Sequence, residues 1–207
     1  MQIAVITVHG CPLRQAGGKD SGGMNIYILE MAKRLAARGV QIDVFTRHHD
    51  PVDPQVISLA PGARLIHLPA GPPSLDKTGV YELLPEFRSQ MRNFCIANRL
   101  QYDQVSSHYW LSGLVGVRIA SAWGVPHTTS FHTTAEMKRR GRPEESEVEQ
   151  RDRSESEVAS AADSIIVWTH DEKQVVVDYF GIDPDRVVVV PPGVDLSHFR
   201  PLSQSQC

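Results

Sequence analysis

A glycine-rich loop between an apolar run and a helical pattern is the first feature that could bind a ligand. The loop joins the apolar run 3–8 to a helix expected over 25–37, and it reads Asp20-Ser21-Gly22-Gly23-Met24-Asn25. The first N–H groups of a helix have no intrahelical partner and attract anions. Because Gly22 and Gly23 lack a Cβ atom, a phosphate or a sugar can approach the backbone closely. The loop therefore predicts a phosphorylated or polyhydroxyl ligand; the alternative is a glycine-rich turn that binds nothing.

Polar side chains also follow three of the expected strands, at the point where each strand ends. They are His9 after the first strand, His108 and Tyr109 after another, and His132, Thr133 and Thr134 after a third. Ligands of parallel α/β sheets bind beyond the carboxyl ends of the strands, so these side chains are expected to share one pocket. A single histidine is more typical of a structural residue or a helix cap. Three strand ends together favour a functional site.

Two further segments can bring cations to that edge of the sheet. Lys77 lies in a loop over 71–77, and Arg151 lies near the start of a helix expected over 147–161. A lysine and an arginine that converge on helix N–H groups would form a phosphate clamp. Arg153 is an alternative to Arg151, because one sequence does not fix the register of this helix start. The rest of the charge run over 138–153 is interpreted as solvated surface.

The elements that must position these residues alternate between strands and helices. Strands are expected at 3–8, 40–46, 64–68, 104–107, 127–131, 164–168 and 186–190. Helices are expected at 25–37, 83–98, 111–123, 147–161 and 171–180, with Gly39, Gly124 and Gly181 just past three of their ends. Several strands are continuous apolar runs, which is typical of strands covered on both faces. The pattern predicts an α/β fold: a Rossmann-like, mostly parallel sheet with helices on both faces.

Composition limits the class of protein. The chain has 207 residues, of which 41% are hydrophobic, enough for one large domain, expected over 1–200 with a tail at 201–207. The net charge of −3 argues against nucleic acid as a partner. Three cysteines without a close pair indicate no disulfide framework and no cysteine metal site, so the cytoplasm is the expected location. No apolar run approaches the roughly 18 residues of a membrane span.

Two other site types are disfavoured. A nicotinamide dehydrogenase would carry Gly-x-Gly-x-x-Gly after the first strand and an acidic residue after the second, where Thr46-Arg47 stands instead. His48-His49-Asp50 offers metal-ligand side chains, but adjacent residues in a loop are more often polar surface. No metal site is therefore predicted.

The motifs, taken in order, resemble the N-terminal half of retaining glycosyltransferases of family 4. The nearest groups are those of sucrose-phosphate synthase and inositol-phosphate glycosyltransferase. The resemblance covers essentially the whole chain, and it rests on His9 to Tyr27, Ser107 to Gly113, Ser130 to Thr133, Ala162-Asp163, and Pro191-Pro192-Gly193-Val194-Asp195 with Phe199.

This resemblance implies a GT-B fold, in which two Rossmann-like domains face each other across a cleft. The N-terminal domain holds the acceptor, a sugar phosphate or similar polyol, and the C-terminal domain holds a UDP- or GDP-linked sugar as co-substrate. No tightly bound cofactor is implied. By motif match, His132 would lie beside the transferred sugar and act in catalysis. The substrate-binding residues would be Gly22, Gly23, Asn25, Lys77, Tyr109, Thr133, Thr134 and Arg151.

The resemblance also implies a donor domain that this sequence does not contain. We expect a C-terminal domain or a separate chain as partner, and little or no transfer by these 207 residues alone. Two functions stay open: the acceptor half of a glycosyltransferase, or a stand-alone module that binds sugar phosphates or another partner without transferase activity.

Overall fold

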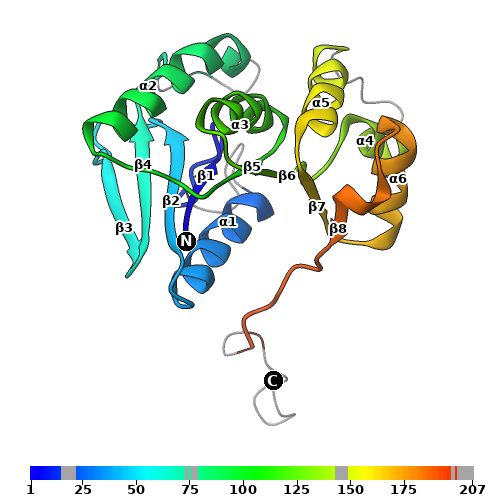
Figure 1. The fold of residues 1–207 in the computed structure, drawn as a ribbon, viewed down its shortest axis with the longest axis horizontal. Coiled ribbons are helices and arrows are strands. Elements are labelled where there is room, and N and C mark those ends of the chain that lie inside the picture. Colours follow the sequence, from blue (N-terminus) through cyan, green and yellow to red (C-terminus); the bar gives the residue numbers. More distant parts are fainter. Residues whose placement is uncertain (15–21, 73–74, 76–78, 143–148, 197–198, 200–207) are drawn as a thin grey trace.

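An eight-stranded sheet built from short, mostly buried apolar runs forms the centre of the molecule (Figure 1). The computed structural model describes residues 1–14, 22–72, 75, 79–142, 149–196 and 199. The strands are β1 (Gln2–Ile6), β2 (Gln41–Arg47), β3 (Val56–Ala60), β4 (Ala63–Leu68), β5 (Gln104–His108), β6 (His127–Ser130), β7 (Ser164–Val167) and β8 (Val187–Val189). Their spatial order is β3-β4-β2-β1-β5-β6-β7-β8.

All neighbouring strands in this sheet pair in parallel except β3 and β4. The chain starts at β1 in the middle, winds outward through β2 and β4 on one side, and through β5 to β8 on the other. The strand order therefore reverses beside β1, between it and β5. In open α/β sheets this reversal leaves a crevice at the carboxyl ends of the strands.

Helices cover both faces of the sheet. They are α1 (Gly23–Ala36), α2 (Leu84–Ala97), α3 (Trp110–Trp123), α4 (Ala135–Gly141), α5 (Glu149–Ala161) and α6 (His170–Phe180), with short 3₁₀ helices η1 (Gly79–Leu83) and η2 (Pro184–Arg186). Ile3 and Val5 of β1 face α1 in one apolar core, whereas Ala4 and Ile6 face α2, α3 and α5 in the other. This alternation along one strand requires helices on both faces.

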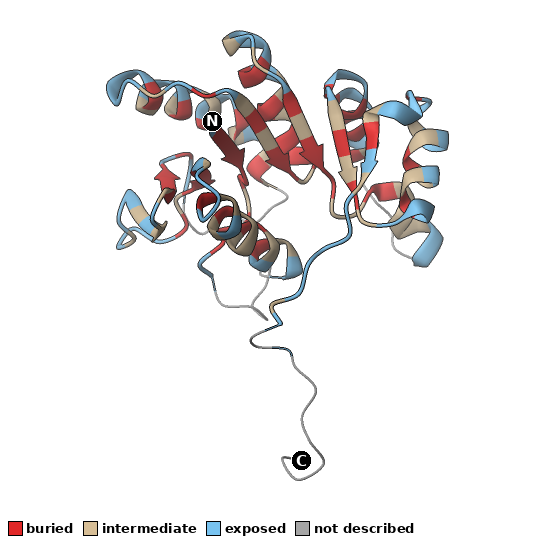
Figure 2. Ribbon diagram, turned by 60° about the horizontal axis from the view of Figure 1, so that its bottom comes forward, coloured by how far each residue is buried: buried red, intermediate tan, exposed pale blue. Residues whose placement is uncertain are grey.

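Burial follows the same layers, since the central strands and the inner sides of the helices are the most buried parts, whereas the edge strands β3 and β8 are partly exposed (Figure 2). Beyond β8, residues 190–196 run away from the sheet as a largely exposed segment (Figures 1 and 2). Among the described residues, the structure contains no helix of the length and apolarity needed to cross a membrane.

The predicted α/β class and the seven predicted strands are confirmed, but one strand and one α-helix were not predicted, nor were the short helices η1 and η2. The strand β3 forms an antiparallel hairpin with β4 across Pro61-Gly62, where Gly62 has φ of +83°. A Pro-Gly pair between two apolar runs is the signal that would have revealed it. The helix α4 follows Thr134, within a segment interpreted as surface loop, and it has only seven residues.

Gly113 lets α3 approach α5 closely. A Cβ atom at this position would lie 2.7 Å from Cγ1 of Val158, whereas a Cβ on Gly141 would meet none of the described residues within 4 Å. We predict that Gly113→Ala lowers the free energy of unfolding by about 1–3 kcal/mol, as overpacked cores do. Gly141→Ala is the matched control and should change it by less than about 1 kcal/mol. Urea denaturation of both variants measures the difference, and equal stability would contradict the close packing of α3 on α5.

Candidate functional site

A pocket of about 220 Å³ lies at the carboxyl ends of β1, β5 and β6, beside the N-terminus of α1. It is lined by His9, Gly22, Met24, Asn25, Tyr109, His132, Thr133 and Lys138. Residues from three strand ends and the glycine loop thus meet in one place, as the sequence predicts. His9, Gly22, Asn25, Tyr109, His132 and Thr133 are the predicted site residues that the structure brings together here, whereas His108 is buried behind His132 and does not line the pocket.

The glycine loop leaves open space at the start of α1. Gly22 is the N-cap residue, with φ of −138° and no side-chain cap, and Gly23 begins the helix. A Cβ atom on either glycine would meet nothing within 4 Å among the described residues. Packing against the described residues therefore does not require glycine here, and a ligand could approach the helix N–H groups closely.

The Asn25 side chain is buried in this pocket without a hydrogen-bond partner. Asn25 is 2% exposed, and both its Oδ1 and its Nδ2 lack a partner within the described part of the chain. Gly10 makes room for the amide, because a Cβ on Gly10 would lie 2.6 Å from Oδ1 of Asn25. Buried polar side chains in proteins almost always have a partner. The amide therefore has the donor and the acceptor ready for groups of a ligand.

Tyr109 and His132 hold unusual backbone conformations at the pocket. Their φ angles are +74° and +61°, values that side-chain-bearing residues rarely adopt. Tyr109 is the N-cap residue of α3, and its N–H donates to the carbonyl oxygen of Ser130 at 2.9 Å. Backbone strain at a strand end costs stability and is typical of functional sites. Here it turns both side chains toward the pocket that they line.

His132 is a neutral side chain in this site. Burial, together with a smaller effect of the nearby charge of His9, lowers its pKa to about 4. Its Nε2 lies 2.9 Å from Nδ1 of His108, a residue that is 1% exposed. The rings of Tyr27 and Trp168 pack against the His132 ring with centroid distances of 5.6 and 5.4 Å. At neutral pH, His132 can therefore donate or accept a hydrogen bond but carries no charge.

Arg151 lies beneath the pocket rather than in its lining. The guanidinium is 1% exposed: Nε donates to Oε1 of Glu155 and Nη2 donates to the carbonyl oxygen of Thr133, each at 2.7 Å. Oε2 of Glu155 accepts the N–H of Ala135 at 2.9 Å, and Cζ of Arg151 lies 5.0 Å from the ring centre of Tyr109. The buried pair thus positions the loop 133–135 and the Tyr109 ring. Direct contact of Arg151 with an acceptor phosphate stays a prediction.

The short helix α4 adds a cation that sequence reasoning assigned to the surface. Lys138 of α4 lines the pocket. The Thr134 hydroxyl is used as the helix cap, accepting the N–H of Met137 at 3.2 Å. The neighbouring Arg139 makes two hydrogen bonds of 2.9 Å to Asp152 of α5, which fastens α4 to the scaffold. Threonine is a common N-cap residue, so the Thr133-Thr134 pair could have indicated a helix start. Lys138 would then lie about one helical turn after Thr134.

Other predicted positions lie elsewhere. Lys77 falls outside the described residues. Arg153 pairs with Glu149 on the exposed side of α5. Between these two helix-start candidates, only Arg151 approaches the pocket region. Of the histidine pair 48–49, His48 donates a hydrogen bond from Nε2 to the carbonyl oxygen of Asp53 at 3.0 Å. Among the residues that the structure describes, no group of three or more His, Cys, Asp or Glu side chains is arranged to hold a metal ion.

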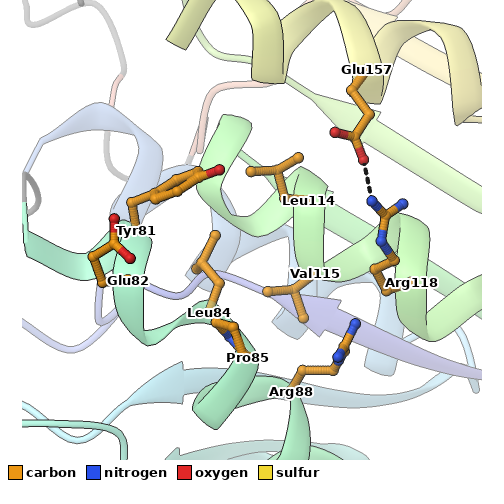
Figure 3. Close-up of a pocket in the computed structure, with 9 residues that line it drawn as sticks. All are labelled: Tyr81, Glu82, Leu84, Pro85, Arg88, Leu114, Val115, Arg118 and Glu157. Atoms are coloured by element: carbon orange, nitrogen blue, oxygen red, sulfur yellow. Dashed lines mark ion pairs between the residues drawn. The ribbon is translucent and has the colours of Figure 1, made fainter. Parts of the chain in front are cut away.

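A second pocket, of about 210 Å³, lies on the outer face of the molecule (Figure 3). Its lining comes from η1, α2, α3 and α5, and its rim carries the ion pair between Arg118 and Glu157. Leu84, Leu114 and Val115 form its apolar floor. It contains none of the residues that follow the sheet strands. The pocket at the strand ends is the candidate functional site because the predicted residues meet there.

Comparison with known proteins identifies the family. Residues 21–198 match the model of Glycosyltransferase Family 4. The chain belongs to this family. It is 45% identical over 204 residues to D-inositol 3-phosphate glycosyltransferase of Thermomonospora curvata, and 43% identical over 210 residues to that of Thermobifida fusca. These alignments cover 97% and 99% of the chain, but only 47% and 48% of the relatives. The family-4 chain thus spans about half the length of these relatives.

The fold matches that of the N-terminal domain of GT-B glycosyltransferases. Sucrose-phosphate synthase from Thermosynechococcus elongatus superimposes with a TM-score of 0.89 at 30% identity, over 97% of this chain and 50% of that one. Anabaena HepE, solved in complex with UDP, matches with a TM-score of 0.60 at 15% identity, which shows the fold alone. The predicted resemblance to family 4 and the predicted fold are therefore confirmed.

Arg151 and Arg153 provide a matched test of the buried pair. Both arginines pair with a glutamate four residues away on α5, but Arg151 is buried with Glu155 whereas Arg153 is exposed with Glu149. We predict that Arg151→Ala lowers the free energy of unfolding by about 3–5 kcal/mol, because it leaves a buried carboxylate unpaired. Arg153→Ala should change it by less than about 1 kcal/mol. Equal effects in urea denaturation would show that the Arg151 pair does not hold the site.

Proposed function

We propose that this chain is the acceptor-binding half of a retaining glycosyltransferase, and that its acceptor is an inositol phosphate or a closely similar sugar phosphate. The sugar would come from a UDP- or GDP-linked donor held by a second domain. The proposal takes its acceptor class from the names of the relatives in Thermomonospora and Thermobifida. The size of those relatives, about twice that of this chain, supports the need for a second domain.

The observation that carries the proposal is the buried, unpartnered amide of Asn25. An amide offers one acceptor and two donors, which match the hydroxyl groups of a polyol because each hydroxyl both donates and accepts. A ligand that formed hydrogen bonds with these atoms would offset the free-energy cost of burying the amide without a partner. An apolar or purely anionic ligand would leave the amide partly unpaired.

The phosphate of the acceptor is expected on the side of the pocket formed by Tyr109, Thr133 and Lys138. A tyrosine or threonine hydroxyl can donate to a phosphate oxygen, and the lysine ammonium supplies positive charge. Arg151 lies behind this group, where Nη2 donates to the Thr133 carbonyl oxygen and Glu155 balances the charge of the guanidinium. Lys77 remains a proposed phosphate ligand from the resemblance.

The chemistry proposed for this site is electrostatic. In retaining transfer the leaving diphosphate helps deprotonate the acceptor hydroxyl, so the protein needs to hold the acceptor and stabilise charge rather than supply a nucleophile. The neutral His132, whose pKa is lowered to about 4 by burial, suits hydrogen bonding to the transferred sugar. No step in this scheme requires a metal ion.

Calorimetric titration with D-inositol 3-phosphate tests the proposal, with fructose 6-phosphate as a competing acceptor and UDP-glucose as a donor control. We predict saturable binding of D-inositol 3-phosphate and no binding of UDP-glucose. Asn25→Ala should weaken that binding about fivefold for each hydrogen bond lost, a value of about 1 kcal/mol. It should leave the free energy of unfolding nearly unchanged, because the amide has no partner within the described chain.

The lysine variants locate the phosphate in the same titration. Lys138→Ala should weaken binding by about 1.5–3 kcal/mol, the range for a charged hydrogen bond. Lys33→Ala, in the last turn of α1, removes the same charge far from the strand ends and is the control. If the acceptor binds the Asn25 and Lys138 variants as tightly as the natural chain, the assignment of this pocket is wrong.

A further inference from the structure

His108 is a buried histidine with no assigned role, and it lies directly behind His132. It ends β5, is 1% exposed, and its Nδ1 lies 2.9 Å from Nε2 of His132. The other nitrogen of His108, Nε2, is buried and has no hydrogen-bond partner among the described residues. The two imidazole rings lie 5.1 Å apart between centroids, so the contact is a side-chain hydrogen bond rather than a stack.

The hydrogen bond between the two histidines requires one ring to donate and the other to accept. Both rings are neutral, because burial lowers the pKa of His108 well below its usual value and that of His132 to about 4. Each ring therefore carries one proton, on one of its two nitrogens. Two arrangements satisfy the contact, and they differ in which nitrogen of each ring is protonated.

The unpartnered Nε2 of His108 indicates which of these two arrangements is favoured. If His132 donated from Nε2, the proton of His108 would sit on its own Nε2, a buried N–H with no acceptor. Buried N–H groups without a partner are rare in proteins, whereas under-satisfied acceptors are more common. The arrangement in which His108 Nδ1 donates leaves only a lone pair unpartnered. It also places the proton of His132 on Nδ1.

We propose that His108 is a positioning residue that fixes His132 in the Nδ1–H tautomer, so that His132 presents a hydrogen-bond donor to its ligand. The Nδ1 of His132 has no hydrogen bond to the described residues, and His132 lines the pocket. The left-handed backbone of His132, with φ of +61°, and the packed rings of Tyr27 and Trp168 keep its ring in place. A neighbouring hydrogen bond is the usual means by which proteins select one histidine tautomer.

This tautomer limits what His132 can do in the proposed function. The identity of its ligand rests on that proposed function. A neutral ring with its proton on Nδ1 and with Nε2 occupied by His108 has no free lone pair to offer the ligand. His132 then cannot remove a proton from an acceptor hydroxyl as a general base. It can only donate a hydrogen bond, for example to a hydroxyl or ring oxygen of a sugar.

The test is a long-range proton–nitrogen NMR correlation of the histidine side chains in this chain without ligand, which distinguishes the two neutral tautomers. We expect His132 in the Nδ1–H form. His108→Asn retains an amide N–H near the place of Nδ1 and should preserve that form, whereas His108→Leu removes the donor. In His108→Leu the ratio of tautomers should shift about fivefold or more toward Nε2–H, the effect of losing one hydrogen bond.

His127 serves as an internal control, since its Nε2 shares a 2.8 Å hydrogen bond with the Ser107 hydroxyl and not with His108. Its tautomer should be the same in all three proteins, and an altered His127 signal would identify a misfolded variant. The Nε2–H tautomer at His132 in the natural chain would overturn the proposal even if no variant folds. An unchanged His132 signal in a folded His108→Leu protein would also overturn it. Neither result depends on which acceptor the pocket binds.

Discussion

The buried ion pair between Arg151 and Glu155 is the interaction on which the site depends. Two of its hydrogen bonds hold the loop 133–135: Arg151 donates to the carbonyl oxygen of Thr133, and Glu155 accepts the N–H of Ala135. The same arginine lies against the ring of Tyr109. Two pocket residues from different strand ends, Thr133 and Tyr109, are therefore tied to one residue of α5. Loss of either partner of a buried ion pair strongly destabilises the fold, because the other charge is left buried and unpaired.

That pair acts within a scaffold whose topology already places the strand ends together. The chain winds outward from β1 in both directions, so the residues after β1, β5 and β6 meet beside the N-terminus of α1. The strained backbone of Tyr109 and His132 then turns their side chains into the shared pocket. Parallel strand pairing, helix packing and the buried ion pair together position the residues of the site. The result is a pocket that holds a buried, unsatisfied amide at Asn25.

Much of this arrangement is readable from the sequence, because the signals are local. Among the described residues, apolar runs, glycines past helix ends and polar residues directly after strands predict seven of the eight strands, five of the six α-helices and six of the pocket-lining residues. The position of Arg151 is not readable in the same way. Arg151–Glu155 and Arg153–Glu149 have the same four-residue spacing, and only tertiary packing buries one pair and exposes the other.

Lys138 was missed for a related reason. It belongs to a run of basic residues with the composition of a solvated surface, and its helix α4 is too short for a periodic pattern to reveal it. Its place in the pocket depends on Arg139, which fastens α4 to Asp152 of α5. Asn25 was predicted to bind a ligand, but the room for its buried amide depends on the absent Cβ of Gly10, a contact between residues fifteen positions apart.

The most direct test of this account is a crystal structure of the chain grown with D-inositol 3-phosphate. The account predicts the inositol hydroxyls on the amide of Asn25, and the phosphate within hydrogen-bond distance of Thr133 and Lys138, with Arg151 still bonded to Glu155. The central claim is that the buried amide and the positioned loop form an acceptor site. Two results would contradict it: the ligand bound in the outer pocket beside Arg118, or the ligand bound at the strand ends with the Asn25 amide still unpaired.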